Sequence, residues 1–411
     1  MKRRGFIRSI GAAPALILLS GATKAHEEPH GLFAHGVASG DPLHDRVILW
    51  TRVSLPRGSG AVEVDWQVSE RRDFSRVVAS GKAQASPERD FCVKVDAAGL
   101  APGRTYYYRF EALGGQSGIG RTRTLPEGEV SKLAFAVASC SNYPAGYFTA
   151  YRDIAEQDDL DAVIHLGDYI YEYAADGYAS QRAAELGRVS VPGHELLTLD
   201  DYRLRHAQYK ADPDAQAMHA AHPMIAVWDD HEVANDAWLF GAENHQPGTE
   251  GDWQARRRRA WQAYNEWMPT RTPNLADHGR LFRSFDFGNL ASLIMLDTRY
   301  FGRDRQIDAM ALADDPEALA AVRENERRQM LGAQQAGWFA ETLKRSADRQ
   351  RWQVIGQQVL VSELLLPDLA PVLDVEEARR RLGDERVDAV LELGGSGMPM
   401  LWDTWDGYAP A

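Results

Sequence analysis

The chain has 411 residues, of which 44% are hydrophobic and 26% are charged, and this composition predicts at least two folded domains rather than a disordered or fibrous protein. Acidic side chains outnumber basic ones by 59 to 46, which gives a formal net charge of -13 and argues against nucleic acid as a partner. The two cysteines, Cys92 and Cys140, are too few for a disulfide scaffold.

The first 25 residues are predicted to be an export signal. Arg3 and Arg4 precede an apolar run at residues 12–19 and a stretch of small residues that ends at Ala25. Adjacent arginines at this place resemble a twin-arginine signal, which directs a folded protein to the twin-arginine translocase. The apolar run is shorter than the ~20 residues of a bilayer-spanning helix. We therefore expect cleavage after residues 1–25, a periplasmic or secreted protein, and no stable membrane span.

Residues 30–125 are predicted to form a β-sandwich domain. Short runs in which polar and apolar residues alternate occur at 47–53, 62–68 and 105–110, and turns rich in glycine and proline separate them. This spacing is typical of a small antiparallel sandwich. Residues 126–129 are then a linker.

Residues 131–411 are predicted to form a layered α/β domain, in which short apolar strands alternate with helices. In such sheets ligands bind beyond the carboxyl ends of the strands, so the residues that follow each strand are the site candidates. The expected buried strands are at 133–138, 162–166, 224–228 and 291–296.

The arginine run at 256–259 lies in a stretch with helical composition. Such a run is more often a solvated helix face than a binding patch, and we expect the solvated face here.

Polar residues that suit metal ions or anions follow all four expected strands, at 139–142, 167–172, 229–235 and 297–299. Each segment has an ordinary explanation by itself: a Gly-Asp turn, acidic residues that cap a helix, or a small buried cysteine. Four such segments in succession favour a metal site, because a parallel sheet would bring its strand ends together at one edge.

Ordered motifs across the chain resemble the family of PhoD-like alkaline phosphatases and phosphodiesterases. The resemblance continues through Gln335 and Trp338, so it covers nearly all of the chain after the signal. It implies a β-sandwich domain, a metallophosphoesterase-like layered domain, a centre of iron (Fe3+) and calcium, and a phosphate ester substrate. The motifs lie at residues 36–42, 138–140, 165–173, 228–232, 296–300, 330–332 and 405–408.

The resemblance assigns Cys140 and Tyr171 as iron ligands and Asp168 as the carboxylate that bridges two metals. Thiolate and phenolate suit ferric iron, whereas carboxylate and amide oxygens suit calcium or magnesium. Two bridged metals neutralise phosphoryl charge and supply hydroxide at neutral pH. Arg299 resembles a catalytic arginine that clamps phosphate, and an ion pair with Asp297 is the alternative.

The resemblance places the second metal, calcium, at the segment after the third strand. Asp229, Asp230 and Asn235 are the candidate ligands, and His231 is a further catalytic candidate beside the phosphate. Which members of this segment bind metal stays open.

The chain departs from the family pattern at its C-terminus. The family's final ligands lie in a Gly-Asp-x-His block beyond the Trp-Asp-Gly-Tyr motif, whereas this chain ends at Ala411 and its last histidine is His278. We expect a C-terminally truncated catalytic domain with an open sheet edge and impaired activity.

The sequence is compatible with two other functions. A phospholipase D-type lipid phosphodiesterase would use the same ligands with a more apolar pocket, and Trp238, Leu239 and Phe240 are compatible with one, although core packing is the expected role of these three. A secreted binding protein without catalysis is the other alternative. The sequence leaves the substrate open among monoester, diester and phospholipid.

Overall fold

The computed structural model describes residues 31–408, except for 57, 273–278, 310, 311, 313, 314, 396 and 397. The expected export signal at residues 1–25 and His278 lie outside the described residues. Contacts group residues 31–411 into one compact unit. In the part of the chain that the structure describes, no helix combines the length and the apolar character needed to cross a membrane.

A sandwich of two sheets forms the N-terminal part, and it contains the three strands predicted there. Alternate residues of each strand face the shared core, as in β6, where Tyr106, Tyr108 and Phe110 are buried while their neighbours are not. The sheet that belongs to the sandwich alone consists of β4 (Val77–Ala85), β3 (Val62–Ser69), β6 (Thr105–Ala112) and β7 (Gly115–Gln116), with β8 (Gly120–Arg123) also paired to β6.

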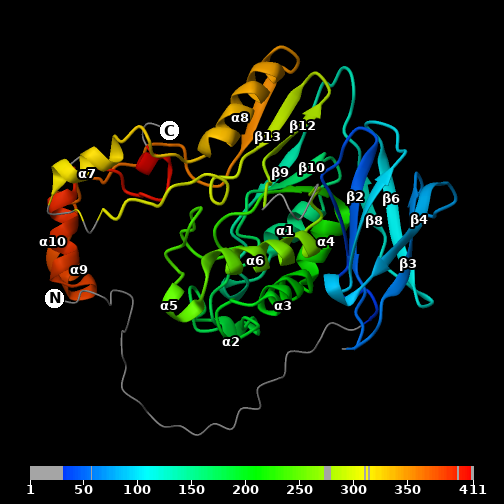
Figure 1. Ribbon diagram of the computed structural model, residues 1–411, viewed down its shortest axis with the longest axis horizontal. Coiled ribbons are helices and arrows are strands. Elements are labelled where there is room, and N and C mark those ends of the chain that lie inside the picture. The colour runs from blue at the N-terminus through cyan, green and yellow to red at the C-terminus, as the bar shows by residue number, and fades with distance from the viewer. Residues whose placement is uncertain are drawn as a thin grey trace, which may run out of the picture. The chain divides into compact units, whose positions relative to one another are not determined.

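The other sheet of the sandwich continues into the α/β part of the chain (Figure 1). β1 pairs with β2 in antiparallel fashion on one side and with β11 in parallel on the other, and β10 is parallel to both β11 and β9. One mixed sheet therefore carries strands of both predicted domains. Its order is β5 (Cys92–Ala98), β2 (Arg46–Arg52), β1 (Val37–Gly40), β11 (Pro223–Ala226), β10 (Ala162–His165) and β9 (Phe135–Ala138).

The four strands predicted after residue 131 are all present, but they do not share one sheet. The fourth, β13 (Ala291–Met295), lies between β12 (Arg283–Phe287) and β14 (Trp352–Gly356) in a separate sheet. β13 follows β12 through a short turn, and the two pair along their whole length, so this local hairpin occupies one edge of β13. The prediction of a single sheet edge for all four strand ends is therefore wrong for β13.

Helices cover the sheets and are capped by side chains at several N-termini. Thr198 and Asp201 form a capping box at α3, and Asp252 accepts a hydrogen bond from Ala255 N at α6. α8 packs on β13 and β14 (Figure 1). The helices are α1 (Thr149–Ala155), α2 (Ala183–Leu186), α3 (Leu199–Lys210), α4 (Pro213–Ala221), α5 (Pro247–Glu250), α6 (Trp253–Trp267), α7 (Pro316–Arg323), α8 (Gly332–Ala347), α9 (Val375–Leu382) and α10 (Asp384–Leu393).

The expectation of a solvated arginine face on α6 is wrong for its first two arginines. Arg256 is 0% exposed and Arg257 is also buried. The guanidinium of Arg256 donates to Glu195 at 2.7 Å, to Glu250 at 3.1 Å and to the backbone of Asn244. Carboxylates from other segments thus allow this charge to be buried, which a reading of the helix alone does not show.

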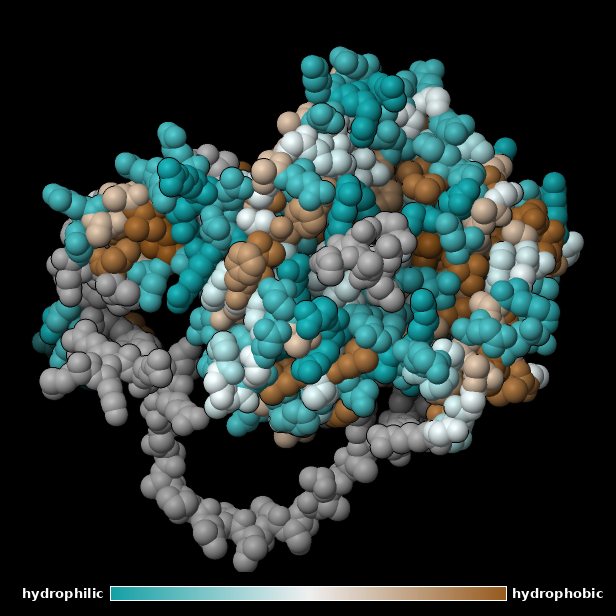
Figure 2. Space-filling model, in the orientation of Figure 1, coloured by the Kyte–Doolittle hydropathy of each residue, from teal (hydrophilic) through white to brown (hydrophobic). Residues whose placement is uncertain are grey.

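On the face shown in Figure 2, hydrophilic and hydrophobic side chains are interspersed. Two outermost strands carry exposed apolar residues, Val137 on β9 and Trp352 on β14.

Candidate metal centre

The turns that follow β9, β10 and β11 meet beyond the carboxyl ends of these strands. Cys140 N donates to Gly167 O at 3.2 Å, and Ser141 N donates to Asp168 O at 2.9 Å, so the first two turns are joined through their backbones. Cys140 and Asp168 adopt left-handed φ values of 58° and 53°. A side chain on Gly167, whose φ is +103°, would lie 2.3 Å from Asp229 N, so the second and third turns are also in close contact.

Asp168 is the central carboxylate of this site and is 6% exposed. Its Oδ2 accepts a hydrogen bond from the Tyr171 hydroxyl at 3.1 Å, whereas its buried Oδ1 has no hydrogen-bond partner among the described residues. Burial raises the pKa of Asp168 well above its usual 3.8, and the neighbouring Asp229 and Asp230 raise it further. A buried carboxylate beside two others needs a nearby cation to remain charged.

Asp168, Asp230 and His231 form a group that can hold a metal ion, because one ligand atom from each lies within 4.8 Å of the others. An oxygen, oxygen and nitrogen set suits several divalent and trivalent ions. The unpartnered Oδ1 of Asp168 is the observation that points to a cation, since a buried acceptor normally has a partner.

His231 is oriented by a second carboxylate. Its Nδ1 lies 2.7 Å from Glu172 Oε2, and its ring stacks on Tyr171 with 4.2 Å between ring centroids. Burial alone would lower the pKa of His231, but Glu172 and Asp230 raise it well above 6.5. Since Nδ1 is occupied by Glu172, Nε2 is the nitrogen left for a metal, a substrate or a transferred proton.

Arg299 lies between carboxylates that come from distant segments. Its guanidinium forms ion pairs with Asp229, with Asp230 at 3.6 Å and with Asp403 at 2.8 Å. The alternative ion pair with Asp297 is not formed by the side chain: Asp297 accepts from the backbone N of Arg299 at 2.9 Å. The guanidinium is thus held at the site, next to the carboxylate group.

The two adjacent aspartates of the third turn differ in pKa. Burial raises the pKa of Asp229 to about 6, although Arg299 opposes the shift. Burial would also raise the pKa of Asp230, but Arg299 and His231 lower it to about 2. Both carboxylates are therefore mostly ionised at neutral pH, and Asp229 is the one that takes up a proton first as the pH falls toward 6.

The remaining predicted ligands surround this group without joining it. Cys140 is an exposed free thiol in the first turn, and it belongs to neither group of metal-binding side chains found among the described residues. Tyr171 contacts Asp168 directly, and burial raises the pKa of its hydroxyl above 10. Asn235 is half-buried, and its side-chain amide faces Glu243 at 3.4 Å.

Several residues of the site were not singled out from the sequence. Asp403 accepts hydrogen bonds from Arg299, from Arg303 at 2.6 Å and from Gln306 at 2.6 Å. It also forms a second group of carboxylates with Asp230 and Asp236. Asp403 lies three residues before the Asp of the Trp-Asp-Gly-Tyr motif, and this proximity is the only signal that the sequence offered.

The expectation of core packing is wrong for Phe240, which is 75% exposed, while Trp238 and Leu239 are half-buried. Leu239 N donates to Arg303 O at 3.1 Å, so this loop is attached to the segment that follows Arg299.

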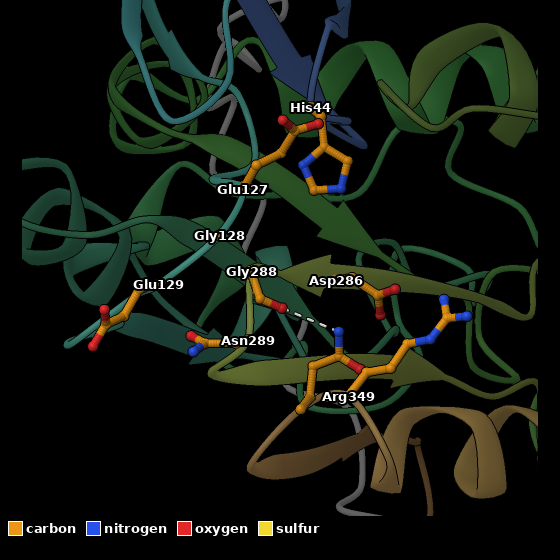
Figure 3. Close-up of a pocket in the computed structure, with 9 residues that line it drawn as sticks. His44, Glu127, Gly128, Glu129, Asp286, Gly288, Asn289 and Arg349 are labelled. Carbon is orange, nitrogen blue, oxygen red and sulfur yellow. Dashed lines mark hydrogen bonds between the residues drawn. The ribbon is translucent and has the colours of Figure 1, made fainter.

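An open pocket of about 520 Å³ lies elsewhere, between the linker after β8 and the turn that joins β12 to β13 (Figure 3). Gln350 Nε2 donates to Gly288 O at 3.0 Å, and both residues line the pocket. None of the predicted site residues lines it. Its lining consists of His44, Glu127, Gly128, Glu129, Asp286, Gly288, Asn289, Arg349 and Gln350.

Comparisons with known proteins cover both parts of the chain. Residues 135–411 match the family model described as PhoD-like phosphatase, and residues 20–126 match the one described as PhoD-like phosphatase, N-terminal domain. Alkaline phosphatase D of Bacillus subtilis (strain 168) is 39% identical over 381 residues, which are 88% of this chain and 63% of that protein. The chain thus spans less than two thirds of the length of this curated relative.

A solved structure described as "Structure of PhoD" aligns with this chain at a TM-score of 0.77 and 36% sequence identity. The alignment covers 95% of this chain and 68% of the other. The shared fold is a layered arrangement of mixed sheets and helices.

Proposed function

Because the chain belongs to the PhoD-like phosphatase family, we propose that it is a metal-dependent phosphoric ester hydrolase centred on Asp168, Asp230 and His231. The unpartnered, buried Oδ1 of Asp168 beside two further ligand atoms is the observation that supports this assignment. The Arg299 guanidinium at the same place supplies a cation for a phosphoryl group.

Two kinds of metal suit the side chains in the three turns. Cys140 and Tyr171, with Asp168 as the shared carboxylate, would hold ferric iron. Asp229, Asp230 and Asn235 offer the oxygen ligands that calcium prefers. When bound, such a pair neutralises phosphoryl charge and lowers the pKa of water.

Arg299 and His231 are proposed to act on the substrate directly. The planar guanidinium can donate two parallel hydrogen bonds to phosphoryl oxygens, and its present partners are the carboxylates that would bind metal. With Asp168 and Asp230 as the metal ligands of this group, the Nε2 atom of His231 stays free to give a proton to the leaving oxygen, because Glu172 stabilises the protonated ring.

We also propose that the two predicted domains have different roles. Residues 131–411 carry the site, and residues 30–125 form a sandwich that supports it. Asp41 links the two parts, since its carboxylate accepts from Arg283 Nη2 at 2.6 Å and from Arg271 N at 2.6 Å. Export to the periplasm or the medium through the twin-arginine translocase is proposed from residues 1–25.

Hydrolysis of p-nitrophenyl phosphate and bis(p-nitrophenyl) phosphate tests the proposal, together with metal content by plasma mass spectrometry. Asp168→Asn should lose iron, calcium and activity together, because the amide cannot serve as a charged bridging ligand. Asp286→Asn is a matched control, since Asp286 lines the separate pocket of Figure 3. Wild-type turnover in a metal-free protein, or unchanged turnover in Asp168→Asn, would contradict the assignment.

A further inference from the structure

Glu232 is a buried carboxylate that contacts two of the three turns. It is 1% exposed. Its Oε2 accepts from Asp168 N at 3.0 Å and from Asp229 N at 2.8 Å, and its Oε1 accepts from Tyr169 N at 2.7 Å. One side chain therefore satisfies three backbone donors that belong to two different turns.

These donors are not satisfied by the strand ladder. β10 ends at His165, and its pairing with β9 and β11 ends there as well. Gly167 and Asp168 then have positive φ values, so the chain leaves the extended conformation and its N–H groups turn away from the neighbouring strands. A buried N–H without an acceptor costs ~1–3 kcal/mol, so an acceptor is needed at this point.

Among the described residues, no basic side chain forms an ion pair with Glu232. Its two oxygens accept instead from the three backbone N–H groups. Glu172 differs in this respect, because it contacts His231 and Asn244 side chains as well as one backbone N–H.

We propose that Glu232 is a positioning residue, which fixes the turn carrying Asp168 against the turn carrying Asp229 and Asp230. The Oε2 atom is the link, because it is shared between one N–H of each turn. Its effect on metal binding and turnover rests on the proposed function, whereas its effect on the two turns does not.

The two oxygens give substitutions at this position a graded effect. In Glu232→Gln one oxygen remains. If the amide NH2 points to Tyr169, this oxygen accepts from the backbone N–H groups of Asp168 and Asp229. If the amide is turned the other way, the oxygen accepts only from the backbone N–H of Tyr169. Glu232→Met keeps the approximate length of the side chain and leaves all three N–H groups without an acceptor. The expected order of disturbance is wild type, then Gln, then Met.

Residue-resolved hydrogen–deuterium exchange on the metal-free protein tests the positioning role directly. In Glu232→Met, the amides of Asp168, Tyr169 and Asp229 should exchange at least ~10-fold faster, while amides of the sandwich strands keep their wild-type rates. In Glu232→Gln, either Tyr169 alone or the Asp168 and Asp229 pair should accelerate. Glu266→Gln is the control, because Glu266 is buried and paired with Arg203, away from these turns.

Calcium titration by calorimetry is the second measurement, and Glu232→Gln should bind calcium ~10–100-fold more weakly than wild type. Unchanged exchange at all three amides in both Glu232 variants would overturn the proposal, as would acceleration spread evenly over the whole chain. If Glu232→Met does not fold, the Gln variant decides by the same exchange criterion. A wild-type protein that binds no metal would instead contradict the proposed function, and the exchange result would still decide the role of Glu232.

Discussion

His206 connects the packing of the core to the pH dependence of stability. It lies on α3, is 1% exposed and stacks between the rings of Trp267 and Tyr169, with centroid distances of 6.4 and 6.3 Å. Its Nδ1 is buried without a hydrogen-bond partner among the described residues. Burial lowers the pKa of His206 to about 3, and the nearby Lys210 contributes to the shift.

The sign of the effect follows from the direction of this shift. The folded state keeps His206 neutral, whereas the unfolded chain binds a proton near pH 6.5, so stability is complete above pH 6.5 and is lost as the pH falls toward 3. Between pH 7.5 and 5.5 the unfolded state gains about 1.4 kcal/mol from this one group. Other buried groups also titrate in this range, so a variant is needed to isolate His206.

His206→Phe retains an aromatic ring and removes the titrating group. Urea unfolding, followed through the 11 tryptophans, gives the free energy of unfolding of both proteins at each pH. Whatever the repacking costs, the variant should gain about 1.4 kcal/mol relative to wild type between pH 7.5 and 5.5. Tyr264→Phe is the control, because Tyr264 contacts the His206 ring. Burial raises the pKa of Tyr264 well above its usual 10, so the effect of this substitution on the free energy of unfolding should not change between pH 7.5 and 5.5.

A difference between His206→Phe and wild type that is the same at both pH values, within about 0.3 kcal/mol, would refute this reasoning. Such a result would mean that the folded protein protonates His206 as readily as the unfolded chain does.

Two further predictions concern stability and the site. Arg256→Met should lower the free energy of unfolding by about 2–4 kcal/mol in urea titrations, because Glu195 and Glu250 lose a buried partner. A loss below about 1 kcal/mol would show that these ion pairs behave like surface ion pairs. Gly167→Ala should lower the melting temperature and abolish phosphatase activity, because its Cβ would lie 2.3 Å from Asp229 N. Gly187→Ala is the matched control, with a φ of +66° and open space around the added atom, and should cost only about 1 kcal/mol and leave activity intact.

The local patterns of the sequence were sufficient to predict the strands and the turns that carry the candidate site residues. Apolar runs of four to six residues mark buried strands wherever they lie, so β9, β10, β11 and β13 were predicted correctly. The residues after each strand identified Asp168, Asp230 and His231, which the structure brings together. The family resemblance was also predicted from these motifs, and the family matches confirm it.

Partners that are distant in the sequence were not predictable in this way. Arg299 binds Asp403, which is 104 residues away, and Glu232 accepts from Asp168 and Tyr169 on another turn. Arg256 was expected in solvent, because its helix alone does not show that carboxylates from two other segments reach it.

The difference has a physical cause. A strand, a turn or a helix cap depends on residues within a few positions of one another, so the sequence by itself determined where the chain presents carboxylates and an imidazole. Burial, pKa and the choice of ion-pair partner depend on which segments the fold packs together, and β13 shows this, because pairing with β12 and β14 placed it in a separate sheet. The tertiary structure alone therefore decided that Arg299 lies among three carboxylates and that Glu232 holds two turns in contact.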